Sequence, residues 1–193
     1  MEINQQVSEQ AVLAKAKKQL LYWGMASMVI FFSAFCSYYL VVHDNGNWLT
    51  FALPTMFYIS TAIIILSSGT MYWAQQAAKK NNAKGIKAGL TFTLLLGITF
   101  CVCQLQAWKA LYANGIVFAG RTSNLSGSIL YVITSMHFFH IVAGIIALLV
   151  TLNKALKNKY TAQSHLGLSL AAIFWHFLDV LWIILFLFLY YFR

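Results

Sequence analysis

Five long apolar runs constrain this chain more than any other feature of its sequence. They occupy residues 20–42, 51–73, 86–111, 128–152 and 166–190. Each exceeds about 20 residues, the length that an α-helix needs to cross the hydrocarbon core of a bilayer. Lipid offers no hydrogen bonds to the backbone, so a spanning segment must satisfy its own peptide groups, as a helix does. The sequence therefore predicts an all-α membrane protein, a bundle of five transmembrane helices.

The remaining residues form short loops and one polar N-terminal segment. Residues 1–19 carry charged and amide side chains and lack the apolar core and cleavage site of a signal peptide. We expect a polar cytoplasmic arm over 1–19, with a surface helix from Ser8, followed by one transmembrane bundle over 20–193. Only 9% of the residues are charged, against about 25% in soluble domains, which also argues for a lipid-embedded chain.

The basic residues are distributed unevenly between the two sides of this bundle. Ten of the 13 Lys and Arg residues fall on the side that holds the arm and the second and fourth loops: Lys15, Lys17, Lys18, Lys79, Lys80, Lys84, Lys87, Lys154, Lys157 and Lys159. The other three are Lys109, Arg121 and Arg193. By the positive-inside rule the N-terminus is cytoplasmic and the C-terminus lies outside. Because the charge is confined to short loops, we expect no nucleic-acid partner.

Ionisable side chains inside the apolar runs are the candidate functional residues, since such groups are costly in lipid. His137 and His140 are spaced i, i+3 in the fourth run, and His176 and Asp179 share that spacing in the fifth. Gln104 lies in the third run. The spacing leaves three interpretations open: a metal or haem site, a proton relay, or a structural polar network between helices.

The short loop between the fourth and fifth runs predicts that these helices are antiparallel neighbours. That arrangement is expected to place His137 level with Asp179, and His140 level with His176. A buried carboxyl needs a proton or a hydrogen-bond partner. The first candidate partner of Asp179 is therefore His137.

Small residues recur every four positions at the start of the third run, at Gly85, Gly89, Thr93 and Gly97. Such a stripe allows another helix to approach closely. We expect it to be a helix-packing surface.

Several short motifs in four of the runs together resemble subunit III of haem-copper oxidases. The fifth run contains Trp-His-Phe-Leu-Asp over 175–179 and then Trp182, similar to the signature of that family. The fourth, third and second runs carry further matching positions in the expected order: Gly127, Ser128, Tyr131, Thr134, His137, His140 and Gly144; Leu96, Gly97, Phe100, Gln104 and Trp108; Ser67, Ser68, Thr70 and Ala74.

The resemblance implies an accessory subunit without catalytic, cofactor-binding or metal-binding residues of its own. It implies haems and copper in partner subunits, a main contact with subunit I, further contacts with subunit II and other respiratory-chain subunits, and bound phospholipid. The complex would couple oxygen reduction to proton pumping in a bacterial plasma membrane, as a cytochrome c oxidase or, alternatively, a quinol oxidase. The family-motif residues expected to pack the bundle are Trp175, Trp182, Trp108, Gly97, Tyr131 and Thr134.

Two departures from the family pattern concern acidic residues. Met28 follows Ser27 where the family often has Glu, and Ala107 precedes Trp108 where the family commonly has Glu. Proton-delivery roles of those acids do not carry over to this chain. It looks like a short form that lacks the first two of seven helices.

Other functions that remain open are a haem b membrane anchor, using two of the three intramembrane His, and a proton-coupled transporter; an odd helix count weakens the transporter hypothesis.

Overall fold

The structure is a computed structural model that describes residues 2–43, 52–120, 123–161 and 164–192, with side chains from Val12 onward. Within these ranges the chain forms five helices: α1 (Glu2–His43), α2 (Thr55–Lys79), α3 (Ala83–Ala113), α4 (Leu125–Leu156) and α5 (Leu166–Phe192). All five contain a stretch long and apolar enough to cross a membrane. The predicted fold class is confirmed.

Helices α3 and α4 begin before the apolar runs that predicted them, and an asparagine caps each of these two starts. The side chain of Asn82 accepts a hydrogen bond from Gly85 N at 3.0 Å at the start of α3. Asn124 accepts one from Ser126 N at 3.0 Å at the start of α4. Such caps satisfy backbone N–H groups that have no partner within the helix. Helix α2 begins at Thr55, later than its predicted start at residue 51, which itself lies outside the described residues.

Helix α1 differs from the expected polar arm with a separate surface helix. It runs without a break for 42 residues, which corresponds to about 63 Å at 1.5 Å per residue, roughly twice the hydrocarbon thickness. No Gly or Pro occurs before Gly24, and the Ala, Gln, Lys and Leu residues of this segment favour helix. The polar segment therefore continues the first span as one rod.

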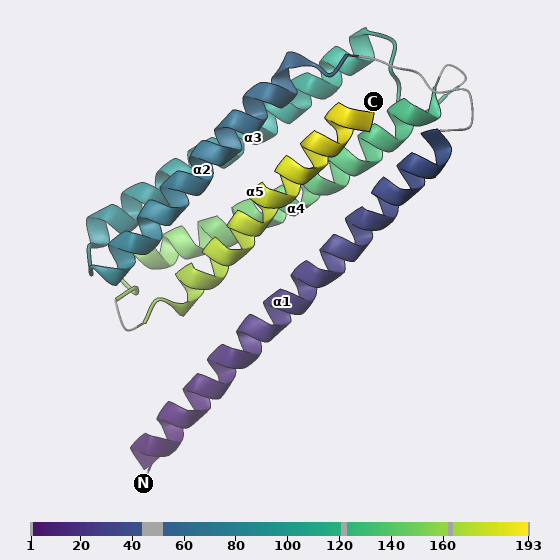
Figure 1. Ribbon diagram of the computed structural model, residues 1–193. Coiled ribbons are helices and arrows are strands. Elements are labelled where there is room, and N and C mark those ends of the chain that lie inside the picture. Colours follow the sequence, from purple (N-terminus) through teal and green to yellow (C-terminus); the bar gives the residue numbers. More distant parts are fainter. Residues whose placement is uncertain (1, 44–51, 121–122, 162–163, 193) are drawn as a thin grey trace.

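Helices α2 to α5 form a closed four-helix bundle, in which α2 packs on α3, α3 on α4, α4 on α5, and α5 on α2. Helix α1 contacts only α4 and α5 within the described residues. Figure 1 shows α1 lying alongside them near its C-terminal end and diverging towards its N-terminus. Of its described side chains, only Phe32 and Tyr39 are buried. Most of α1 is therefore free to contact lipid or another chain.

The small-residue stripe brings α2 and α3 together, as predicted. A Cβ added to Gly89 would lie 3.0 Å from both Cα and N of Ala74, and one added to Gly85 would lie 2.8 Å from Cβ of Ala77. Real Cβ atoms do not approach neighbours so closely without a shift. The two backbones can pack at this distance only because these positions of α3 have no side chain.

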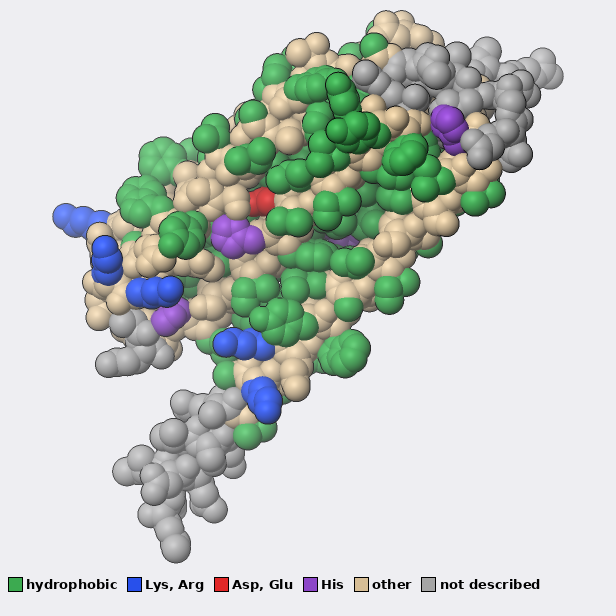
Figure 2. Space-filling view, viewed as in Figure 1, with side chains coloured by type: hydrophobic (Ala, Val, Ile, Leu, Met, Phe, Trp, Pro, Cys, Tyr) green, Lys and Arg blue, Asp and Glu red, His purple; other side chains and the backbone are tan. Residues whose placement is uncertain are grey.

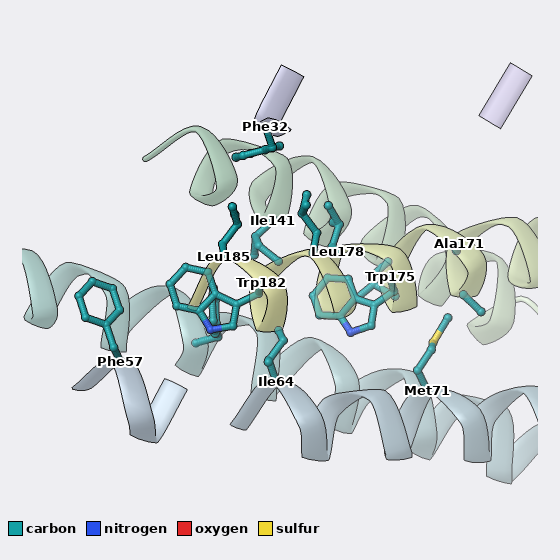
Figure 3. Packing of buried hydrophobic residues seen from close by; sticks show 14 of the residues in the cluster. Phe32, Phe57, Ile64, Met71, Ile141, Ala171, Trp175, Leu178, Trp182 and Leu185 are labelled. Carbon is teal, nitrogen blue, oxygen red and sulfur yellow. The ribbon is translucent and has the colours of Figure 1, made fainter. Parts of the chain in front are cut away.

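Trp175 of α5 contacts each of the other three helices of the bundle. Its side chain is 1% exposed, and its indole N–H donates to Ser67 Oγ on α2 at 2.8 Å. A Cβ on Gly97 of α3 would lie 2.7 Å from the ring, and one on Gly144 of α4 would lie 3.2 Å from it. Figure 3 shows Trp175 and Trp182 side by side, facing Ile64 on α2.

The lysines of the α2–α3 and α4–α5 connections lie at one end of the molecule, called here the basic end. The C-termini of α2 and α4 and the N-termini of α3 and α5 meet there (Figure 1). Figure 2 shows the Lys and Arg side chains of the visible face gathered towards the same end. The fold thus brings together the residues on which the predicted sidedness rests, and the sidedness itself stays a prediction.

Candidate functional site

His176 and Ser68 form a polar contact across the α2–α5 seam near the middle of the bundle. Ser68 Oγ lies 2.6 Å from His176 Nδ1, and both side chains are partly buried. Ser68 was not among the predicted site residues. A serine pair inside an apolar run, at 67 and 68, was the sequence signal that pointed to it.

Asp179 lies one helical turn beyond His176 on α5 and is 2% exposed. Neither carboxyl oxygen has a hydrogen-bond partner among the described residues, so the predicted bond to His137 is wrong. Ser68 is close enough to this carboxyl to interact with it, although no hydrogen bond of ordinary geometry joins the two. A buried carboxylate without a partner costs several kcal/mol, so the group needs a proton or a rearranged Ser68.

His137 occupies an aromatic enclosure instead of a polar one. Its ring centroid lies 5.1 Å from that of Trp182, 6.2 Å from that of Phe100 and 6.3 Å from that of Phe32. The side chain is fully buried, and neither ring nitrogen has a hydrogen-bond partner in the described part of the chain. His137 is thus beside Trp182, about one turn along α5 from the position predicted for it.

Packing between α4 and α5 explains this difference in register. Gly144 leaves room for two α5 side chains: a Cβ there would meet Leu178 at 2.9 Å and Trp175 at 3.2 Å. Because α4 and α5 are antiparallel, these contacts place the residues near the start of α4 opposite α5 residues that follow Asp179 in the sequence. The close fit of large and small residues sets the register, and the polar residues follow it.

The other two predicted polar residues have separate partners. His140 Nδ1 donates to the carbonyl of Met136, on its own helix, at 2.7 Å. Gln104 Nε2 donates to Ser60 Oγ on α2 at 3.1 Å, while its Oε1 has no partner among the described residues. The five predicted residues therefore do not share one hydrogen-bond network in the part of the chain that the structure describes.

The family-motif residues join helices through specific hydrogen bonds. Trp108 Nε1 donates to Thr134 Oγ1 at 3.0 Å, which links α3 to α4. The Tyr131 hydroxyl donates to the Ile116 carbonyl at 3.0 Å and so holds the segment after α3. Trp182 Nε1 donates to Thr61 Oγ1 at 3.0 Å, which links α5 to α2.

The described residues contain no group of three or more His, Cys, Asp or Glu that could hold a metal ion. Ala107, which stands where the family commonly has Glu, is fully buried. The chemistry available among the polar residues is hydrogen bonding and proton transfer, concentrated at Ser68, His176 and Asp179.

Comparison with known proteins agrees with the motifs and the fold. The sequence model of the family described as Cytochrome c oxidase subunit III matches residues 8–193. A "Cytochrome c oxidase subunit 3" from Thermostichus vulcanus is 30% identical over 178 residues, covering 89% of this chain and 84% of that protein. The Drosophila melanogaster protein of the same name is 35% identical over 132 residues, covering 68% and 48%.

A "Probable cytochrome c oxidase subunit 3" from Rickettsia felis is 36% identical over 137 residues, which is 70% of this chain and 47% of that protein. The chain thus spans about half the length of the first curated relatives that it matches. With a match along nearly its whole length and the helices in the expected order, the chain belongs to the cytochrome c oxidase subunit III family.

Proposed function

We propose that the chain is the accessory, non-redox subunit III of an aerobic haem-copper oxidase in a bacterial plasma membrane. The observation that carries the proposal is the family match over residues 8–193. The names of the relatives favour cytochrome c as electron donor to the complex, and a quinol oxidase is the alternative. Haems and copper belong in partner subunits, with subunit I as the main contact and subunit II and other respiratory-chain subunits beyond it.

The exposed apolar surface of α1 supports assembly with other chains. Val29, Ile30 and Val41 are 47%, 71% and 67% exposed, along a helix that touches the bundle on one side only. Such a surface is covered by lipid or by partner helices in a membrane. We place the partner subunit on this broad apolar side.

An apolar groove between α1 and α5 supports the proposal of bound phospholipid. The groove has a volume of about 640 Å³ and is lined by residues such as Phe32, Cys36, Phe177, Ile184 and Phe188. Apolar walls of this kind suit an acyl chain, and the groove has few polar groups to compete for it.

Purification of the native complex in mild detergent tests the proposed function. The chain is expected to copurify with haem-containing oxidase subunits, and the haem spectrum should stay with those subunits when the complex is dissociated. Oxygen consumption should be supported by reduced cytochrome c in preference to a quinol. Recovery of the chain without oxidase subunits, or with haem bound to the chain itself, would refute the proposal.

Removal of the chain from the complex tests its accessory role. An oxidase that lacks it should keep most of its initial turnover, since no redox ligand is removed, and should lose activity sooner during continued turnover. A complete loss of initial turnover in a complex whose other subunits stay assembled would contradict an accessory role.

A further inference from the structure

The α2–α5 seam holds a buried carboxyl, that of Asp179, close to a serine hydroxyl of α2. Both oxygens of Asp179 are enclosed and unpartnered among the described residues. Ser68 Oγ lies 2.6 Å from His176 Nδ1, and Asp179, one helical turn beyond His176 on α5, is close enough to Ser68 to interact with it. His176 is less buried than Asp179. The three side chains thus run in the order Asp179, Ser68, His176, from the buried side of the seam to its more exposed side.

The exposure of the three side chains differs along the seam. Asp179 is 2% exposed, whereas Ser68 and His176 are partly buried. A partner helix can therefore reach His176 more readily than Asp179, and Ser68 of α2 lies at the contact with α5.

We propose that Asp179, Ser68 and His176 form a proton-exchange site, in which Asp179 binds and releases a proton through the serine hydroxyl and the imidazole. The inference goes beyond the accessory role proposed above and does not depend on it. A hydroxyl is suited to this position because it both donates and accepts a hydrogen bond. Imidazole is suited to the outer position because its two ring nitrogens can take up and pass on a proton.

Proton uptake is a concerted transfer of protons from His176 to Ser68 and from Ser68 to Asp179. His176 accepts a proton at Nε2 and donates its Nδ1 proton to Ser68 Oγ, while Ser68 donates its hydroxyl proton to the Asp179 carboxylate. The carboxylate gains one proton, Ser68 ends with one, and the imidazole ends neutral with its proton on Nε2. Release reverses each transfer. A side-chain rotation that brings Ser68 Oγ into bonding distance of the carboxyl is the movement required.

A cleft on the same seam leads from the basic end towards this site. It has a volume of about 200 Å³ and is lined by Gln75, Lys79, His165, Leu168, Ser169 and Ile173. Ile173 is one helical turn from His176 on α5. Polar and titratable side chains line this cleft, which forms the entry side of the proposed path.

The surroundings of the site contain few other titratable groups. On α2, Tyr72 is one helical turn from Ser68 and is 58% exposed. Lys79 of α2 and His165, just before α5, line the cleft at the basic end. On α4, His137 contacts Trp182 and has no described hydrogen bond to the site. Proton exchange at Asp179 is therefore expected to depend on Ser68 and His176.

Infrared spectroscopy of the purified native complex tests this site independently of oxidase activity. A C=O stretching band of a protonated carboxyl should be present in the wild type and absent from Asp179→Asn, and Asp179→Glu should restore it at a shifted frequency. The band should shift on transfer to heavy water. Because positioned proton-transfer groups typically contribute about a hundredfold or more in rate, Ser68→Ala and His176→Phe should slow that exchange by about a hundredfold.

Ser67→Ala is the matched control, because Ser67 is adjacent on α2 but accepts its hydrogen bond from Trp175. Its exchange rate should equal that of the wild type. Exchange in Ser68→Ala at the wild-type rate would overturn the relay. A wild-type spectrum without a band that depends on Asp179 at any pH would overturn the protonated carboxyl itself.

Discussion

Trp175 and Trp182 attach α5 to α2 through the same kind of bond. Each indole N–H donates to a hydroxyl on α2, that of Ser67 at 2.8 Å and that of Thr61 at 3.0 Å. Both rings are buried. Since lipid cannot replace such a bond, each Trp is both a large packing group and a specific donor. The family motif of the fifth helix can thus be understood as helix attachment.

Replacement of Trp175 by Phe tests the contribution of this bond. The variant should lower the stability of the bundle by about 1–2 kcal/mol, because Ser67 loses its donor in a buried site. Thermal unfolding of the purified complex in detergent measures the effect. Trp73→Phe is the control, since Trp73 is 47% exposed, and equal losses in the two variants would contradict the assignment.

At the scale of elements, the α2–α3 pair is the most closely packed part of the bundle. The two helices approach so closely that the backbone of Ala74 occupies the space of a side chain on Gly89. Thr70 and Thr93 add a hydroxyl–hydroxyl contact of 2.8 Å within the same interface. Close packing and interhelical hydrogen bonds are the forces that join helices in lipid.

Gly89→Ala should force these helices apart. Overpacking of a close interface costs about 1–3 kcal/mol, and here the obstructing atoms belong to backbone, which cannot rotate away. Gly69→Ala is the matched control on α2, because no atom lies within 4 Å of the added Cβ. We expect a lower unfolding temperature of the complex for Gly89→Ala only. An unchanged temperature for that variant would show that α2 can shift at little cost.

At the scale of the whole molecule, the chain is an integral membrane protein with one closed four-helix bundle and one outlying helix. Helix α1 leans on α4 and α5 and leaves most of its surface uncovered. The basic end contains the lysines of two connections, and three more, Lys15, Lys17 and Lys18, lie in the N-terminal half of α1. This asymmetry predicts that the basic end faces the cytoplasm.

Thiol labelling in intact cells tests that orientation. Lys80→Cys, which leaves the Asn82 cap in place, should react with an impermeant reagent only after the cells are permeabilised. Asn114→Cys, at the opposite end of the bundle, should react from outside. The native cysteines lie within helices α1 and α3, and Cys103 is buried, so the unsubstituted chain serves as the background. Labelling of Lys80→Cys from outside would reverse the predicted topology.

The helices and one of their interfaces follow from local properties of the sequence. The apolar runs predict five helices because length and hydropathy are local properties set by bilayer thickness. The small-residue stripe predicts a close interface because a missing side chain has the same effect wherever the partner lies. The full length of α1 was not predicted, since apolar length measures the part in the bilayer and the polar residues 2–19 continue the same helix.

Which polar groups meet depends on how the folded helices pack. The sequence placed His137, His140, His176 and Asp179 at mid-helix but paired Asp179 with the wrong residue. The register of α4 against α5 depends on how Trp175 and Leu178 fit around Gly144, which is a property of two surfaces and not of either helix alone. That fit places His137 beside Trp182 and leaves Asp179 to Ser68 of α2, a neighbour more than 100 residues away in the sequence.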